Sequence, residues 1–295
     1  MSVGILGYGN LGKALYRQLL KKGESVCVFS DREECREGRE GVFYSSAVLR
    51  EGNIPLDVLY LAHGSHGGYR NELLGLCERY HLVSVYDIHS ELASFKEEID
   101  NNAKLHQTVT IFGIGWDPGL LSLARVLSKS VFPETDPKTQ WGEGVSEGHS
   151  FAIRQIQGVR EGIQYTVPTE GSHRRVCYIV ADEREQSSIR TKILGMSEYF
   201  SVENTEIHFI SEEEFKENHK GNCFHRGRVY QQLPDKSAEL LFLVSMKSNP
   251  DFTARIMIAY SVALTRLFQE KRFGAFGPLD IPLSYLLPEQ NCSFW

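Results

Sequence analysis

Two aspartates in this sequence follow short apolar segments and carry side chains that can hold a cation or accept a proton. Asp87 stands in residues 86–89 (YDIH), and Asp117 stands in residues 115–119 (GWDPG). Ligands of open α/β sheets bind beyond the carboxyl ends of the strands, so two carboxylates at such ends can face one cavity. This pair suits recognition of an ammonium group, or acceptance of a proton during amine oxidation. Asp117 has a second interpretation, as the cap of a helix that begins near Pro118, which does not exclude contact with a ligand.

A second set of polar residues, in the later part of the chain, suits a carboxylate. The stretches 172–175 (SHRR) and 225–228 (HRGR) each combine histidine with arginine, and Thr166 and Asn249 lie before and after them. Arginine binds a carboxylate through two parallel hydrogen bonds, and His, Thr and Asn add directed ones. We expect the two stretches to meet and to form a local cationic site, although each residue alone is more often a solvated surface group.

A third stretch, residues 141–150 (WGEGVSEGHS), places three glycines around a tryptophan and a histidine. Glycines in this density indicate backbone that closely approaches a ligand or another chain segment. A structural loop with a packed tryptophan is an equally good interpretation.

Residues 7–12 (GYGNLG) form a GxGxxG sequence between an apolar segment and a helical pattern. In this context the glycines allow a tight turn, approach of a pyrophosphate and close helix–strand packing, with the phosphate at the helix N-terminus. We therefore predict a dinucleotide site, against the alternative of a glycine-rich turn. About 20 residues further on, a carboxylate at Asp31 suits the ribose hydroxyls of NAD, whereas Ser30 and Arg32 suit the 2′-phosphate of NADP. The sequence leaves that choice open.

Alternating strand and helix patterns in the first part of the chain predict a doubly wound parallel sheet of the Rossmann type. The expected strands are 3–6, 25–29, 57–62, 82–86 and 109–112, and the expected helices begin at Leu11 and cover 72–80 and 92–105. Beyond a helix at 120–128 and a loop at 131–138, the pattern changes to longer strands at 175–181, 203–210, 227–231 and 239–247. These strands predict a second α+β domain, with an antiparallel sheet and helices on one face. A last helix is expected at 252–271.

The composition excludes several classes of protein. The chain has 295 residues, a net charge of −6 and 41% hydrophobic residues, which is typical of a globular protein with about two domains. Its six cysteines form no CxxC pair and no zinc-like spacing, so we expect a reducing compartment and no metal site. The sequence shows no block of basic residues of the kind that binds nucleic acid. It also shows no signal-peptide pattern and no apolar segment long enough to span a membrane. A cytoplasmic protein that acts on a small molecule is expected.

These strings together resemble the meso-diaminopimelate dehydrogenase family from about Val3 to about Pro288. The runs that carry the resemblance are GYGNLG (7–12), GWDPG (115–119), WG with S and GHS (141–150), QYT (164–166), VAD (180–182) and NPDFTA (249–254). Several separate strings in the same order are far more specific than the glycine motif alone. The resemblance implies NADP-dependent, reversible oxidative deamination of the D-centre of meso-2,6-diaminopimelate to L-2-amino-6-oxopimelate, or tetrahydrodipicolinate, and ammonia in lysine biosynthesis. It also implies a homodimer.

The resemblance further implies a role for individual residues. Asp87 and Asp117 would bind the reacting amino group. The remaining substrate contacts would be Trp141, Glu147, Gly148, Thr166, Arg175, His225 and Asn249. The cofactor contacts would be Gly7, Tyr8, Gly9, Asn10, Leu11, Ser30, Asp31, Arg32, Ala62, His63, Gly64, Ser65, Val85, Tyr86, Ile114, Gly115 and Trp116. The domains would be a dinucleotide-binding domain (1–118), a substrate-binding and dimerisation domain (119–251), and a C-terminal helix and tail (252–295) that return to the first.

Four departures from the family pattern bear on specificity. Asp31 stands where an arginine is usual for the 2′-phosphate, so NAD is an alternative to NADP. Glu147 replaces a glutamine, Arg226 replaces a glycine, and the segment from Thr166 to His173 is short. Two other functions therefore stay open at this point: an NAD(P)-dependent dehydrogenase of another D-amino acid, and a dinucleotide-binding sensor without turnover.

Overall fold

The structure is a computed structural model that describes residues 1–31, 42–51, 54–64, 68–86, 92–169, 172–196 and 199–287. Arg32, Ser65 and Asp87, three of the predicted site residues, lie outside these ranges. The chain forms two compact units. The first contains residues 1–123 and 250–295, and the second contains residues 124–249.

The first unit is built on a seven-stranded parallel sheet with the strand order β13-β6-β5-β4-β1-β2-β3. Its strands are β1 (Ser2–Leu6), β2 (Ser25–Phe29), β3 (Val42–Tyr44), β4 (Val58–Leu61), β5 (Leu82–Ser84), β6 (Val109–Ile111) and β13 (Gly274–Phe276). The central strands are buried on both faces, which explains why they read as continuous apolar runs rather than alternating ones. The predicted Rossmann-type α/β class is confirmed.

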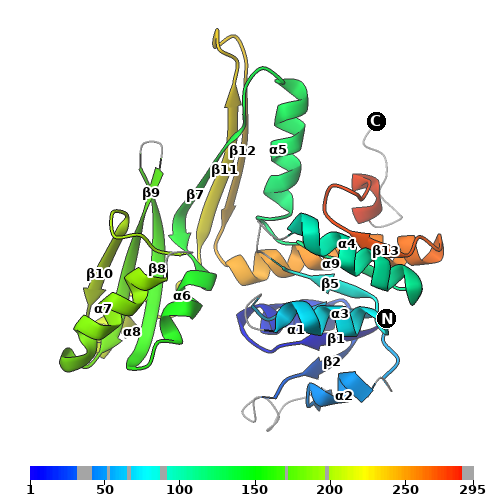
Figure 1. Ribbon diagram of the computed structural model, residues 1–295, viewed down its shortest axis with the longest axis horizontal. Coiled ribbons are helices and arrows are strands. Elements are labelled where there is room, and N and C mark those ends of the chain that lie inside the picture. The colour runs from blue at the N-terminus through cyan, green and yellow to red at the C-terminus, as the bar shows by residue number, and fades with distance from the viewer. Residues whose placement is uncertain are drawn as a thin grey trace. The chain divides into compact units, whose positions relative to one another are not determined.

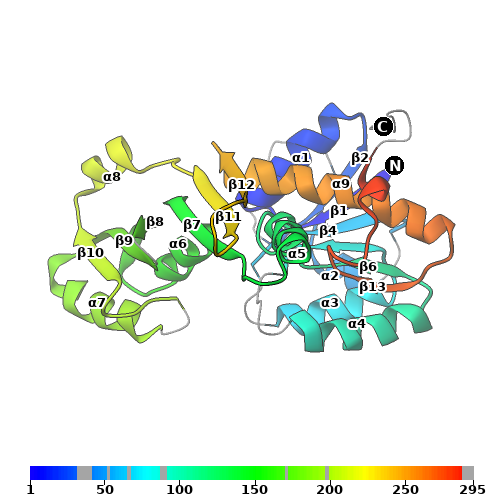
Figure 2. The ribbon, with the colours of Figure 1, turned by 90° about the horizontal axis from the view of Figure 1, so that it is seen from above.

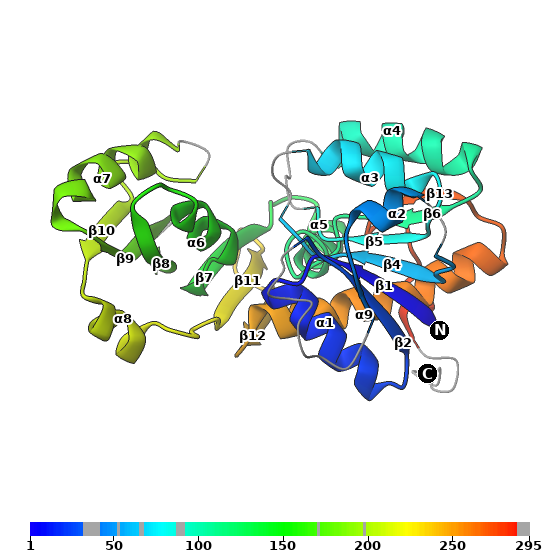
Figure 3. The ribbon, with the colours of Figure 1, turned by 90° about the horizontal axis from the view of Figure 1, so that it is seen from below.

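Helices cover both faces of this sheet (Figures 2 and 3). One face packs against α1 (Asn10–Lys21) and α9 (Asn249–Gln269), and the other packs against α2 (Ala47–Glu51), α3 (Tyr69–Cys77) and α4 (Leu92–Leu105). Helix α1 buries Leu15 and Leu19 on the stripe that the four-residue spacing predicts. The start of α9 is tied to α1, because Arg17 lies 2.9 Å from the Asp251 carboxylate.

The second unit is built on a six-stranded sheet with the order β10-β9-β8-β7-β11-β12. The strands are β7 (Lys138–Val145), β8 (Val159–Thr169), β9 (Ser172–Ala181), β10 (Thr205–Phe209), β11 (His225–Gln232) and β12 (Glu239–Met246). The helices are α5 (Leu120–Val131), which begins in the first unit, α6 (Glu147–Arg154), α7 (Gln186–Gly195) and α8 (Glu212–Asn218). Figure 1 shows α5 beside the long β11–β12 hairpin.

Two expectations for this second sheet are wrong. The sheet is mixed rather than antiparallel, because β10 runs parallel to β9 after the crossover through α7. Helices also cover both faces: α6 and α7 pack on the face of Cys177 and Ile179, whereas Phe215 of α8 packs with Val180 on the other. The stretch around the three glycines is not a loop, since residues 141–145 belong to β7 and 147–150 open α6.

Among the described residues, no helix combines the length and apolar character needed to cross a membrane. The same residues contain no group of three or more His, Cys, Asp or Glu side chains placed to hold a metal ion.

Candidate functional site

The predicted cofactor residues that the structure describes lie at one edge of the parallel sheet. They follow the carboxyl ends of β1, β2, β4, β5 and β6: Gly7 to Leu11, Ser30 and Asp31, Ala62 to Gly64, Val85 and Tyr86, and Ile114 to Trp116. Because these strands are parallel, their carboxyl ends share an edge, and this edge is where open α/β sheets bind ligands.

The glycine turn between β1 and α1 fits a pyrophosphate. Gly7 has φ +95°, a conformation that side chains disfavour, and a Cβ at Gly12 would lie 2.0 Å from the Gly7 carbonyl oxygen. A Cβ at Gly9 would meet no described heavy atom within 4 Å, so the backbone is open on that side. Helix α1 has no acidic residue in its first turn, which leaves its positive N-terminus suited to an anion.

Two serines that sequence reasoning missed hold the Asp31 carboxylate. Ser45 Oγ and the Ser46 backbone N–H donate to Asp31 Oδ1 at 2.8 and 2.9 Å, and the Ser46 hydroxyl donates to Oδ2. Asp31 follows β2 and the serines follow β3, so these bonds join neighbouring strand ends. A three-residue strand such as β3 has no periodic pattern that could have identified them.

Asp117 lies in a tight, half-buried loop after β6. Leu120 and Leu121 donate backbone hydrogen bonds to the carbonyls of Gly115 and Trp116, at 3.0 and 2.9 Å, and so close the loop around Asp117. Helix α5 begins at Leu120, so Gly119 occupies the position before it. The predicted helix start near Pro118 is therefore two residues early.

In the second unit, three predicted substrate residues lie in one row across neighbouring strands. Arg175 of β9 pairs with Thr166 of β8, Thr166 with Gly144 of β7, and Gly144 with His225 of β11. Residues in register on neighbouring strands project to the same face of a sheet. Gly144 is required in the row, because a Cβ there would lie 2.4 Å from the His225 Cα.

The row offers buried donors to an anion. Arg175 Nε is buried and has no hydrogen-bond partner among the described residues, and burial lowers the pKa of the guanidinium. Thr166, its neighbour in register, is 5% exposed. A buried cationic donor without a partner destabilises the fold unless a ligand supplies the missing hydrogen-bond acceptor. The geometry therefore favours a carboxylate at this point.

The other predicted substrate residues of this unit lie near the row in sequence or contact. The Asn249 backbone N–H donates to the Cys223 carbonyl at 2.9 Å, beside the start of β11. Glu147 and Gly148 open α6, whose preceding residue Ser146 donates its N–H to the Gln164 carbonyl at 3.0 Å. Trp141 is 37% exposed, and the centroid of its ring lies 6.4 Å from that of the His173 ring.

His225 at the end of the row and His149 beside the row are both neutral at neutral pH. Burial lowers the pKa of His225 to about 4, against an opposing effect of backbone hydrogen bonds. Burial also lowers the pKa of His149 to about 4; its hydrogen bond to Gln164 opposes this shift, and the nearby Arg175, His173 and His225 add to it. Among the described residues of the row, Arg175 is therefore the one cation at neutral pH, and His225 and the neighbouring His149 carry no charge.

These pKa values predict that the protein loses stability in mild acid. The unfolded histidines bind protons near pH 6.5 and the folded ones only near pH 4, so stability falls as the pH drops through that window. At pH 5 each of the two histidines should lower the free energy of unfolding by about 2 kcal/mol. Thermal unfolding at pH 7 and pH 5 measures the effect, and His149→Asn should show a smaller pH dependence than the wild type. Equal dependences would contradict the role of His149.

The expected meeting of the two arginine stretches is wrong in part. Strands β9 and β11 are separated by β8 and β7, and strand alternation sends Arg174 and Arg226 to the face opposite Arg175 and His225. Arg174 lies 3.4 Å from Glu206, and Arg228 donates to Gln140 at 2.6 Å. The cationic site thus contains Arg175 without the other three arginines.

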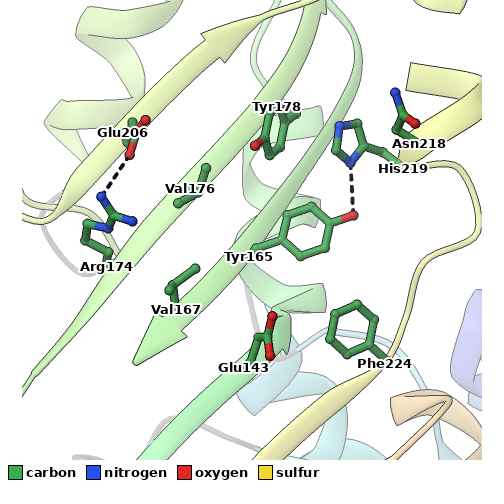
Figure 4. A pocket seen from close by; sticks show the side chains of 10 residues that line it. All are labelled: Glu143, Tyr165, Val167, Arg174, Val176, Tyr178, Glu206, Asn218, His219 and Phe224. Carbon is green, nitrogen blue, oxygen red and sulfur yellow. Dashed lines mark hydrogen bonds and ion pairs between the residues drawn. The ribbon is translucent and has the colours of Figure 1, made fainter. Parts of the chain in front are cut away.

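A pocket of about 400 Å³ lies on that opposite face, away from the row (Figure 4). Its lining includes Glu143, Tyr165, Arg174, Tyr178 and His219. Tyr165 and Arg174 alternate along their strands with Thr166 and Arg175, so no residue of the row lines this pocket.

Comparison with known proteins identifies the family. A family model described as the diaminopimelic acid dehydrogenase C-terminal domain matches residues 115–172 and 169–239, and one described as NADP oxidoreductase, coenzyme F420-dependent, matches residues 2–40. The meso-diaminopimelate D-dehydrogenase of Acetivibrio thermocellus is 35% identical over 315 aligned positions, which cover 97% of this chain and 94% of that protein. The chain belongs to the meso-diaminopimelate D-dehydrogenase family. The family member of Corynebacterium glutamicum is 31% identical, with 98% of this chain and 96% of that protein covered.

Two solved structures have the same fold over nearly their whole length. C. glutamicum DAP dehydrogenase in complex with DAP matches with a TM-score of 0.90 at 30% identity, over 98% of this chain and 96% of that one. An engineered D-amino acid dehydrogenase bound to NADP⁺ matches with a TM-score of 0.90 at 29% identity, over 98% and 97% of the two chains.

Proposed function

We propose that this protein is an NADP-dependent oxidoreductase that deaminates the D-centre of meso-2,6-diaminopimelate. The reaction converts the substrate, NADP⁺ and water into L-2-amino-6-oxopimelate, ammonium, NADPH and a proton, and it is reversible. The product cyclises to tetrahydrodipicolinate, a step that fits lysine biosynthesis. The comparisons do not favour the two alternatives, another D-amino acid dehydrogenase and a sensor without turnover.

One observation in this chain supports the substrate most strongly. The buried Arg175 Nε lacks a partner among the described residues and lies in register with Thr166, in the row that ends at His225. A substrate with a carboxylate at its distal L-centre supplies the missing acceptor. Asn249, whose backbone is bound to Cys223 beside His225, is proposed to complete the contacts to this centre.

The reacting D-centre is assigned to the carboxylates that follow the first sheet. We propose that Asp117, with Asp87, binds the D-amino group, accepts the proton that its ammonium form must lose, and stabilises the iminium charge that develops as the C–H bond breaks. When bound, the nicotinamide accepts the hydride. The chain's own residues orient the C–H bond and hold the amino group, which is the main protein contribution in a cofactor-dependent reaction.

The glycine turn and the open N-terminus of α1 support the dinucleotide, and the family supports NADP. Asp31, held by Ser45 and Ser46, is an anionic group where a 2′-phosphate would be repelled. We therefore expect NADP to be the cofactor, with a smaller preference over NAD than an arginine at this position would produce.

A matrix of two cofactors and three substrates tests the proposal. NADP⁺ and NAD⁺ are each combined with meso-, LL- and DD-diaminopimelate, and reduction is followed at 340 nm. The expected result is turnover with the meso isomer and NADP⁺, weaker turnover with NAD⁺, and none with the LL isomer, which has no D-centre. No reduction with any diaminopimelate would exclude the proposed function.

We further propose that the protein is a homodimer through the second unit. Leu241 and Leu243 alternate on one face of β12 and are 53% and 65% exposed, and Val126, Leu127 and Val131 of α5 are also exposed. A concentration of exposed apolar side chains is typical of a protein interface.

The cytoplasmic location stays a prediction from the sequence.

Leu243→Asp should convert the dimer into a monomer at micromolar concentration, because a carboxylate would be buried between two apolar surfaces. Size-exclusion chromatography with light scattering measures the mass. Val202→Asp, a change at a 74% exposed residue before β10, is the matched control and should leave the mass unchanged. A wild-type protein that elutes as a monomer would contradict the proposal.

A further inference from the structure

A buried glutamine, Gln164, lies two residues before Thr166 on β8 and projects to the same face of the sheet. Gln164 is 0% exposed, and residues two apart on a strand project to the same side. Gln164 Nε2 donates to Thr166 Oγ1 at 3.3 Å. Both side chains are buried, so this bond forms away from competing water.

The other end of the Gln164 amide is held by His149. His149 Nδ1 lies 2.7 Å from Gln164 Oε1, and because a carbonyl oxygen only accepts, Nδ1 carries the proton. The imidazole is packed against the rings of Tyr199 and Phe200, at 5.0 and 5.4 Å between centroids. Its position and its tautomer are therefore both fixed.

The main chain of Gln164 is fixed as well. Its N–H donates to Ser150 Oγ at 2.9 Å, and its carbonyl accepts from the Ser146 N–H at 3.0 Å. Both serines belong to the first turn of α6 or precede it, so this helix holds the strand and carries His149.

From this arrangement we infer that His149 and Gln164 are positioning residues that set the direction of the Thr166 hydroxyl. The inference rests on the proposed function. His149 directs the Gln164 carbonyl toward itself, so the Gln164 amide N–H points at Thr166 Oγ1. That oxygen already accepts a hydrogen bond, and the hydroxyl proton is left to point at a ligand. Thr166 therefore acts as a donor beside Arg175 Nε, and the two donors match a carboxylate.

A reversed amide would give the opposite chemistry. With the Gln164 oxygen toward Thr166, the hydroxyl would donate to Gln164 and present only an acceptor, which suits an ammonium group. The distal centre of meso-diaminopimelate carries both groups on one carbon. The direction of the hydrogen bonds from His149 through Gln164 to Thr166 thus decides whether the carboxylate or the ammonium group lies at Thr166. It thereby also decides which stereocentre is held at the distal end.

Three variants test the inference by steady-state kinetics with meso-diaminopimelate and NADP⁺. His149→Phe removes the donor to Gln164, and Gln164→Glu removes the donor to Thr166. Each should raise KM for the diamino acid about tenfold, the effect of one lost hydrogen bond, with kcat and KM for NADP⁺ within about twofold of the wild type. His149→Asn keeps an N–H near the position of Nδ1 and should restore KM.

A double-mutant cycle separates positioning from packing. If Gln164 acts through Thr166, then Gln164→Glu should have no further effect on KM in a Thr166→Val background. Ser261→Ala is the matched control: it removes a buried hydrogen bond from the Ser261 hydroxyl to the Ile258 carbonyl within α9, so it should lower the melting temperature without a selective change in KM.

The outcomes distinguish this inference from the function on which it rests. A wild-type enzyme without activity on meso-diaminopimelate would overturn the proposed function. An active wild type whose KM is unaffected in folded His149→Phe and Gln164→Glu variants would overturn the positioning role alone. Additive effects in the double-mutant cycle, or equal effects of His149→Asn and His149→Phe, would also overturn it.

Discussion

Asp117→Asn is expected to lower kcat with meso-diaminopimelate by at least about a hundredfold, within the range for a group that assists proton transfer. The amide keeps the size of the side chain but removes its charge, so it neither accepts the proton that the ammonium group loses nor stabilises the positive charge that develops during hydride transfer. The loop around Asp117 is closed by backbone bonds from Leu120 and Leu121, which the substitution does not touch. Steady-state kinetics at saturating substrate measures the effect.

The binding of the cofactor provides the internal control for Asp117. KM for NADP⁺ should change by about twofold or less, because the charge is lost without a change in the backbone that follows β6. Asp136→Asn is the matched variant, since this carboxylate is 88% exposed and forms a surface ion pair with Lys129. It should leave kcat unchanged. A normal kcat in Asp117→Asn would remove Asp117 from the site.

Arg175→Met should raise KM for meso-diaminopimelate about a hundredfold, with a smaller effect on kcat. The variant keeps an apolar stem of similar length and loses a charge-assisted, two-donor contact, which contributes about 2 to 3 kcal/mol. Arg175→Lys keeps the positive charge but lacks the planar guanidinium group. Its KM should lie between those of the wild type and Arg175→Met, about tenfold above the wild type. Binding of the diamino acid by calorimetry, without cofactor, gives a second measurement that does not depend on turnover.

Arg174→Met is the control that the strand itself provides. Arg174 is the neighbouring residue on β9, projects to the opposite face and pairs with Glu206 at 3.4 Å between exposed side chains. The Arg174→Met variant should have a KM for meso-diaminopimelate within about twofold of the wild-type value. Equal effects of the two arginine variants would contradict the assignment of the carboxylate site to one face of the sheet.

The first sheet could be predicted closely because its strands and helices carry strong local patterns. The apolar runs predicted β1, β2, β4, β5 and β6, and the predicted helix 92–105 has the bounds of α4. Strands β3 and β13 were missed, since three residues carry no period. β13 also pairs with β6 across more than 160 residues of chain, and only the tertiary fold specifies that pairing.

The second sheet and its site were harder to predict for a different reason. Gly142 and Gly144 are unusual in a strand interior, and they made β7 read as a loop. The row from Arg175 to His225 depends on the register of four strands, and a shift of one residue would move each side chain to the other face. The resemblance supplied the candidate residues, and their roles stay predictions until the variants are measured.

The interrupted path of the chain has a consequence for synthesis on the ribosome. The second unit is continuous, from residue 124 to residue 249, whereas the first also needs residues 250–295. A nascent chain that ends near Asn249 holds every strand of the second sheet but lacks α9 and β13, so Met257, Ala263 and Leu267 are missing from the first core. The inserted unit can therefore complete its folding first, and the nucleotide-binding unit, although its glycine turn is translated at the outset, closes last.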